Sequence, residues 1–116
     1  MLLDKNGKLV KSLDFRGTSI EKLDALSAHE LFLIITSAQQ QVHLTQVFRA
    51  TELAPECWEE TVYAPILRVA GGDKMTALRL FGVVIKQALI ISPFLFSQSS
   101  GGEREAVTYY KETLEF

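Results

Sequence analysis

Cysteine and proline are both scarce in this sequence, and each scarcity excludes a class of protein. The 116 residues contain one cysteine, Cys57, so neither an intramolecular disulfide nor a multi-cysteine metal site can form. Only three prolines, together with a hydrophobic content of 47%, exclude a collagen-like or intrinsically disordered chain. A single thiol fits a reducing compartment, so we expect a cytoplasmic protein.

Long hydrophobic runs are also missing. The longest uncharged apolar piece, residues 88–96, has nine residues, whereas a membrane-spanning helix needs about 20. Residues 1–8 contain no apolar core behind a basic start, which a secretory signal would require. We therefore expect no association with a membrane.

The net charge is small. Twelve basic and fourteen acidic residues give a net charge of −2, which offers little attraction for the phosphates of nucleic acid. The first 22 residues are weakly basic, but no recognition helix rich in arginine or lysine accompanies them. We therefore do not expect nucleic acid as a partner. An alternative interpretation is a nucleic-acid-binding regulator that uses this N-terminal basic arm.

Helix-forming signals dominate what is present. Ser27 and Glu30 have the spacing of a capping box, in which each side chain bonds the other's backbone N–H. This cap predicts a long helix over residues 28–53, which Pro55 stops. The helix carries one apolar stripe: Leu31, Ile34, Ile35, Ala38, Val42 and Thr45.

A second cap, Asp73, predicts a helix over residues 74–91. This segment is apolar around most of its circumference, and a helix of that kind is buried on more than one side. Residues 56–69 also have helical spacing, but Pro65 removes a backbone donor and should kink that helix or split it after Tyr63.

The two ends of the chain are less regular. Residues 1–17 are expected to form a short extended arm or hairpin, because residues 4–7, Asp-Lys-Asn-Gly, are a turn signal. Residues 103–116 fit either a helix or a strand that pairs with residues 8–15, and we favour the helix.

These signals predict a mainly α protein. Residues 1–116 would form a single domain. In it, residues 18–116 make a small antiparallel bundle of three to five helices, one of them kinked at Pro65, behind the N-terminal arm or hairpin.

The residues that could carry chemistry are not spaced for it. His29 and His43 are fourteen residues apart, whereas two imidazoles on one helix reach the same metal ion at a spacing of three or four. Cys57 lies among three glutamates and has no histidine nearby to act as its base. We therefore expect a non-enzymatic protein with no catalytic residue, no cofactor and no metal.

The excess of apolar helix surface predicts association instead. We expect a homodimer that also binds a protein partner through an apolar helical surface, as an anti-activator, immunity or adaptor protein does. The candidate interface lies on the second face of the 74–91 helix and on the apolar residues around it: Leu80, Val84, Ile91, Phe94, Phe96 and Trp58.

A small-molecule-binding helical domain is the other alternative interpretation. Its pocket would lie between the long helix and the 74–91 helix. Polar groups would have to converge inside that pocket, and the available candidates are Gln40, His43, Tyr63 and Arg79.

Overall fold

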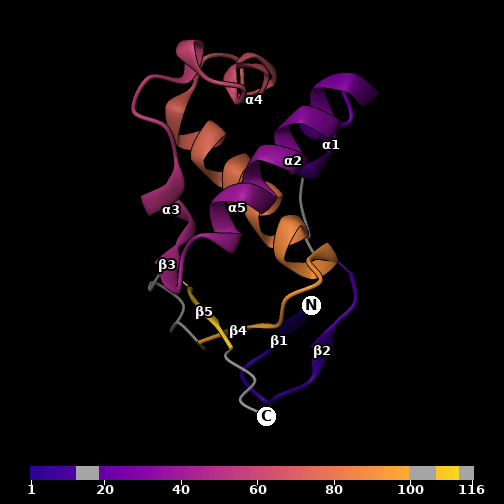
Figure 1. Cartoon of the computed structure of the whole chain (residues 1–116). Helices are drawn as coiled ribbons and strands as arrows, with labels where there is room; N and C mark the ends of the chain where they lie inside the picture. The colour runs from indigo at the N-terminus through magenta and orange to yellow at the C-terminus, as the bar shows by residue number, and fades with distance from the viewer. Residues whose placement is uncertain (13–18, 100–106, 113–116) are drawn as a thin grey trace.

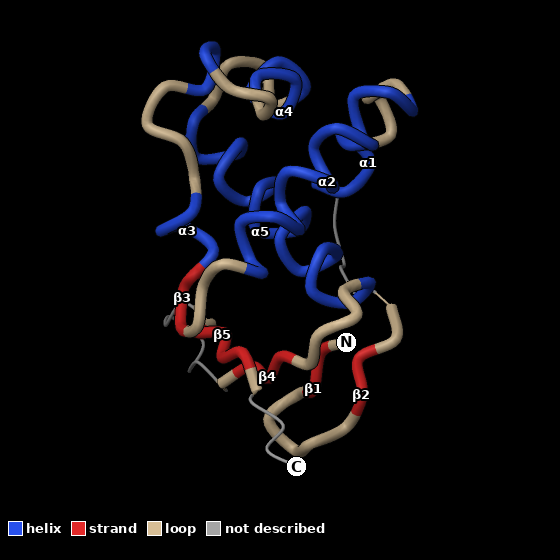
Figure 2. The backbone as a smooth tube through the Cα atoms, in the orientation of Figure 1, coloured by secondary structure: helices blue, strands red, loops and turns tan. Residues whose placement is uncertain are grey.

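The computed structural model describes residues 1–12, 19–99 and 107–112, and it combines helices with a five-stranded mixed sheet. The labelled helices lie together on one side of the sheet (Figure 1, Figure 2). The helices are α1 (Ser19–Leu23), α2 (Ala28–His43), α3 (Ala50–Leu53), the 3-10 helix η1 (Trp58–Glu60), α4 (Ala64–Val69) and α5 (Lys74–Ile91). The strands are β1 (Leu2–Leu3), β2 (Leu9–Val10), β3 (Val47–Arg49), β4 (Phe96–Gln98) and β5 (Thr108–Lys111). The prediction of a mainly α bundle is therefore wrong, because this is an α/β protein.

The N-terminal hairpin forms around the predicted turn. Asp4 Oδ1 accepts hydrogen bonds from the backbone N–H groups of Asn6 and Lys8, at 2.8 and 2.9 Å. Gly7 has a φ of 77°, a value that glycine adopts without strain. The hairpin is not a separate arm, because β1 continues the sheet by pairing in parallel with β4. Of the predicted arm, residues 13–17 lie outside the described residues.

The sheet is assembled from distant parts of the chain. Its strand order is β2-β1-β4-β5-β3, and all neighbouring pairs except β1 and β4 are antiparallel. Residues 108–111 therefore form a strand between β4 and β3. The prediction that these residues form a helix is therefore wrong. The alternative prediction, a strand that pairs with residues 8–15, is also wrong, because β5 pairs with β4 and β3. Residues 103–106 and 113–116 lie outside the described residues.

The predicted helix over residues 28–53 is broken in two. Helix α2 ends at His43, and the chain then forms β3 before the short helix α3. The hydroxyl of Thr45 donates to the carbonyl of Gln41 and so satisfies one of the last acceptors of α2. Strand β3 places Phe48 in the core, where its ring contacts Phe96 and Tyr109. That burial favours the strand over continued helix.

Pro65 splits the predicted helix after Tyr63, as expected, and the alternative of a kink within one continuous helix is wrong. Pro65 stands in the first turn of α4, where its missing N–H breaks no helical hydrogen bond. The residues before it form η1 and turns, and Thr61 ends η1 by donating its hydroxyl to the carbonyl of Trp58.

Helix α5 is the centre of the molecule, as its composition predicted. Asp73 caps it by accepting from the N–H of Met75. Helix α5 contacts α1, α2, α3 and α4, so most of its apolar circumference is covered within the chain, with Met75 and Ile91 left exposed near its two ends. The rings of Trp58 and Tyr63 meet Phe81 edge to face, with centroids 5.9 and 5.0 Å away. These contacts bury the face of α5 that carries Phe81.

Candidate interaction surface

The six residues predicted as one interface do not form one surface in this structure. Four of them are buried inside the chain: Leu80, Val84, Phe96 and Trp58. The physical reason is that α5 packs against α1, α2, α3 and α4 of its own chain, with Val84 facing Leu31 and Ile35 of α2. Ile91 and Phe94 are exposed, with 48% and 47% of their surface accessible.

A different set of apolar residues lies on the surface. Leu31, Phe32 and Ile35 of α2 lie next to Ile91 at the end of α5, and we call these four residues the apolar face. Phe32 is the most exposed of them, at 66%. A large aromatic side chain with this exposure has little contact with its own chain.

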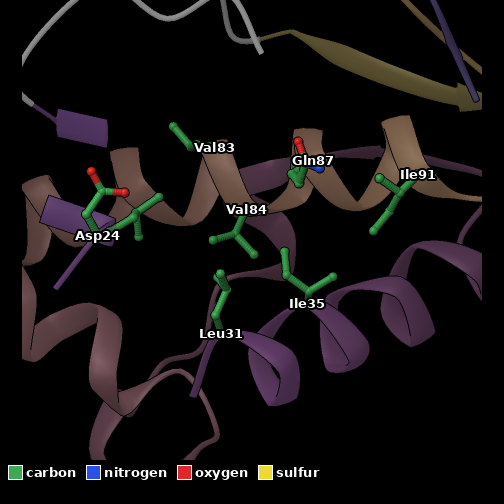
Figure 3. Close-up of a pocket in the computed structure, with 8 residues that line it drawn as sticks. Asp24, Leu31, Ile35, Val83, Val84, Gln87 and Ile91 are labelled. Carbon is green, nitrogen blue, oxygen red and sulfur yellow. The ribbon is translucent and has the colours of Figure 1, made fainter. Parts of the chain in front are cut away.

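The apolar face contains two adjoining hollows. The first lies between α1, α2 and α5 and has a volume of about 280 Å³. Figure 3 shows Val84 and Ile91 of α5 and Leu31 and Ile35 of α2 pointing toward one another across it. Its lining is Leu23, Asp24, Leu31, Ile35, Val83, Val84, Gln87 and Ile91.

The second hollow is more open, with a volume of about 430 Å³. It shares Leu31, Ile35 and Ile91 with the first hollow, so the two form a continuous surface. Its lining is Ala28, Leu31, Phe32, Ile35, Thr36, Gln39 and Ile91.

The sequence of α2 explains why this surface is apolar. No ionisable side chain occurs from Leu31 to Gln41, a stretch of three helical turns. The stripe predicted for this helix is divided: Ile34, Ala38 and Val42 are buried, while Leu31 is exposed and Ile35 half-buried.

Phe32 was not in that stripe. The run Leu-Phe-Leu at 31–33 could have identified it, since three consecutive apolar residues on a helix cannot all face the core.

An ion pair holds the N-terminal end of α2. Two nitrogens of the Arg68 guanidinium donate to the two carboxylate oxygens of Glu30, at 2.8 and 2.9 Å. The Arg68 hydrogen bond and the Ser27 backbone N–H together lower the pKa of Glu30 to about 2. The capping box predicted from Ser27 and Glu30 forms here, with both hydrogen bonds present. This end of the apolar face is therefore anchored to α4.

A second anchor lies near the C-terminal end of α2. The hydroxyl of Tyr63 donates to the side-chain oxygen of Gln41, whose amide nitrogen donates to the carbonyl of Leu53 at 3.4 Å. Burial raises the pKa of Tyr63 to about 12, so the hydroxyl stays protonated and remains a donor. The two contacts link both ends of α2, which carries the apolar face, to other segments of the chain.

The ends of α2 and α5 meet at His43 and Ser92. Nε2 of His43 lies 2.9 Å from Oγ of Ser92, a contact of the kind that serine hydrolases use. Here Ser92 is buried, at 2% exposure, and its Oγ also accepts from the N–H of Phe94 at 3.1 Å. Within the described ranges no carboxylate contacts the imidazole to orient it. The pair therefore joins the C-terminal ends of α2 and α5.

Two cations lie beside this pair. Nζ of Lys111 donates to the backbone carbonyl of His43 at 2.8 Å and lies 4.6 Å from the centre of the Phe94 ring. The ammonium group of Met1 donates to the carbonyls of Leu89, Ser92 and Phe94. Burial lowers the pKa of His43, and the charges of Lys111 and of the Met1 ammonium lower it further.

The remaining candidate residues stay apart from one another. His29 and His43 lie at opposite ends of α2. Cys57 is exposed, and its Sγ lies 3.6 Å from a carboxylate oxygen of Glu59. None of the polar groups proposed for a pocket lines either hollow: Gln40, His43, Tyr63 and Arg79.

The described residues offer neither a metal-binding cluster nor a membrane-spanning helix. Among the residues that the structure describes, no cluster of three or more histidine, cysteine, aspartate or glutamate side chains could hold a metal ion. In the same part of the chain, no helix combines the length and the apolar character needed to cross a membrane. Comparison of the chain with protein-family models, curated proteins and solved structures found no match.

Proposed function

We propose that this chain is a non-enzymatic interaction or regulatory protein, of the anti-activator, immunity or adaptor type, that binds a protein partner through the apolar face. The observation that carries the proposal is Phe32. This aromatic side chain is 66% exposed beside two apolar hollows, on a helix side that bears no charge.

The chemistry of the apolar face suits a protein contact. Contiguous exposed apolar surface is uncommon on monomers, and aromatic residues are enriched in the centres of interfaces. Covering Phe32 and Ile91 removes apolar area from water, which stabilises a complex by about 25 cal/mol for each Å² buried. The anchored α2 limits the conformational entropy that binding would cost.

The proposed site of action is the cytoplasm. Cys57 is an exposed free thiol, and such thiols persist in reducing compartments.

Affinity capture from the cells that encode the chain tests the proposed function. The immobilised wild type is compared with Phe32→Glu, which places a charge in the middle of the apolar face. Leu44→Glu is the matched control, because Leu44 is an 88% exposed apolar residue at the end of the same helix, outside the apolar face.

We expect the wild type and Leu44→Glu to retain the same protein, and Phe32→Glu to lose it. That protein can be a further copy of this chain or a different one. If all three forms retain the same set of proteins, the apolar face is not the binding surface and the proposal fails.

The hollow between α1, α2 and α5 favours a second candidate function, the binding of a small apolar ligand. Its volume of about 280 Å³ lies at the lower end of ligand pockets, and Asp24 and Gln87 supply polar groups in its lining. Titration with a hydrophobic fluorescent probe tests this function. We expect saturable binding to the wild type that Ile35→Trp abolishes by filling the hollow. Equal binding to both forms would exclude the hollow as the site.

A further inference from the structure

We propose that the apolar face is occupied by a second copy of this chain, related by a twofold axis. In this dimer, Phe32 of each protomer inserts into the hollow between α1, α2 and α5 of the other. The inference rests on the proposed function, since it names the partner of the same surface.

The apolar face contains both parts of such a contact. Phe32 projects from α2, and the hollow opens beside it, with Leu31 and Ile35 in the linings of both hollows. A contact around a twofold axis uses the same patch on each protomer, so this patch must contain both the projecting group and the site that receives it. If the partner were a different protein, the patch would need only the projecting group or only the receiving hollow.

The hollow is large enough for the inserted ring. Its volume is about 280 Å³. For comparison, an apolar cavity of roughly 150 Å³ lined by aliphatic and aromatic side chains is large enough to bind benzene. Figure 3 shows aliphatic side chains of α2 and α5 facing one another across it. Asp24 and Gln87 are the polar members of its lining.

The charge pattern of α2 also favours a second copy. A twofold contact through α2 brings this helix close to itself, and like charges placed opposite each other would weaken the contact. From Leu31 to Gln41 the helix has no ionisable group, so this repulsion does not arise. The polar residues in the lining of the second hollow are uncharged, namely Thr36 and Gln39, and Asp24 is the one ionisable residue in the lining of the first hollow.

This dimer differs from the one that the sequence predicts. Leu80 and Val84 of α5 were expected to form the contact, but both are buried within the protomer. The apolar excess of α5 is covered by its own chain. The unpartnered apolar surface lies instead on α2 and at Ile91.

Sedimentation equilibrium of the full chain is the first test. From about 10 µM to about 1 mM, we expect the wild type and Leu44→Glu at twice the chain mass of 13.0 kDa. Phe32→Glu should have the mass of one chain. Phe32→Ala should raise the dissociation constant of the dimer at least about 30-fold, the effect of truncating an aromatic hot spot. Circular dichroism confirms that each variant is folded.

Photocrosslinking then locates the contact. p-Benzoylphenylalanine is placed at position 32, and isotopically light and heavy chains are mixed so that mass spectrometry separates crosslinks between copies from those within one copy. We expect crosslinks between copies to the segments that line the hollow, around Leu23 and around Val83 to Gln87.

Three results would overturn the dimer: a wild-type chain that is monomeric at 1 mM, a dimer that Phe32→Glu leaves intact, or crosslinks from position 32 to other segments of the second copy. The proposed function fails separately. If the wild type is monomeric but Phe32→Glu still abolishes capture of a different protein, the apolar face remains a binding surface and only the dimer is excluded.

Discussion

The imidazole of His43 lies 2.9 Å from the hydroxyl oxygen of Ser92, and this contact joins the C-terminal end of α2 to that of α5. The charged groups that face it are both positive: Lys111 from β5 and the Met1 ammonium from the start of the chain. A protonated His43 would be a third positive charge in this half-buried cluster. The folded chain therefore favours the neutral imidazole.

Acidification should destabilise the fold through His43. Folding lowers the pKa of His43 below its usual 6.5, so the unfolded chain binds the proton more readily than the folded chain. The contribution of His43 is complete above pH 6.5 and is lost as the pH falls through 6.5 toward the folded value. Urea unfolding between about pH 8 and pH 5 should show this fall in the wild type and a flatter profile in His43→Gln.

His29→Gln is the control for this experiment, because His29 is an exposed residue in the first turn of α2. It should keep the slope of the wild type. A His43→Gln profile as steep as that of the wild type would mean that His43 does not carry the effect. The lowered pKa values of Glu30 and Asp73 act in a more acidic range, below their usual 4.5 and 3.8.

Removing Arg68 should raise the pKa of Glu30 part of the way to its ordinary value, because the hydrogen bonds with Ser27 remain. Arg68→Gln takes away the bidentate hydrogen bonds that hold the pKa of Glu30 at about 2, so the value should rise toward the usual 4.5. An NMR titration of the Glu30 carboxyl carbon measures this change. Arg79→Gln is the control, because Arg79 acts on Asp73, whose pKa is lowered mainly by the Thr76 hydroxyl and also by the charge of Arg79. The stability contributed by the Glu30 carboxylate is present above pH 4.5 and is lost as the pH falls toward 2.

Truncations on α5 should be costly. Phe81 and Ile85 are fully buried, so Phe81→Ala and Ile85→Ala should each lower the free energy of unfolding by about 2–5 kcal/mol. Met75→Ala, at a 62% exposed position of the same helix, should change it by no more than about 0.5 kcal/mol. Chemical denaturation measures all three variants. Losses below about 1 kcal/mol for both core variants would contradict the burial of this face.

A charge on the second face of α5 should unfold the protein. Leu80→Glu and Val84→Glu each place a carboxylate in the core, which costs several kcal/mol out of a total stability of about 5–15 kcal/mol. We expect insoluble chains or chains without a cooperative thermal transition. A folded, monomeric Val84→Glu would instead restore Val84 as an interface residue.

Neither the thiol nor a metal should be required for folding. Cys57→Ser changes an exposed side chain, and its Tm should equal that of the wild type. Exhaustive chelation should likewise leave the thermal transition unchanged. The test is informative because a metal-dependent domain unfolds when its metal is removed. A lower Tm after chelation would reveal a metal site that the sequence does not predict.

The sequence by itself determined the features that depend on residues close together along the chain. The capping box of Ser27 and Glu30, the cap of Asp73 and the turn before Gly7 each involve contacts within four residues. Such contacts form whatever the rest of the chain does, so local pattern was sufficient to predict them. The burial of α5 was also predictable, since apolar residues cover most of its circumference.

Only the tertiary structure decided where the strands form and which apolar surface stays uncovered. Val47 pairs with Tyr110 and Leu2 with Phe96, and these partners are far apart in the sequence. The strands are two to four residues long, too short for an alternation pattern to compete with the helical signals around them. An apolar pattern shows how much surface a helix must bury but not which part of the chain will cover it. The second face of α5 was therefore assigned to a partner although the chain covers it, and Phe32 of α2 was left exposed.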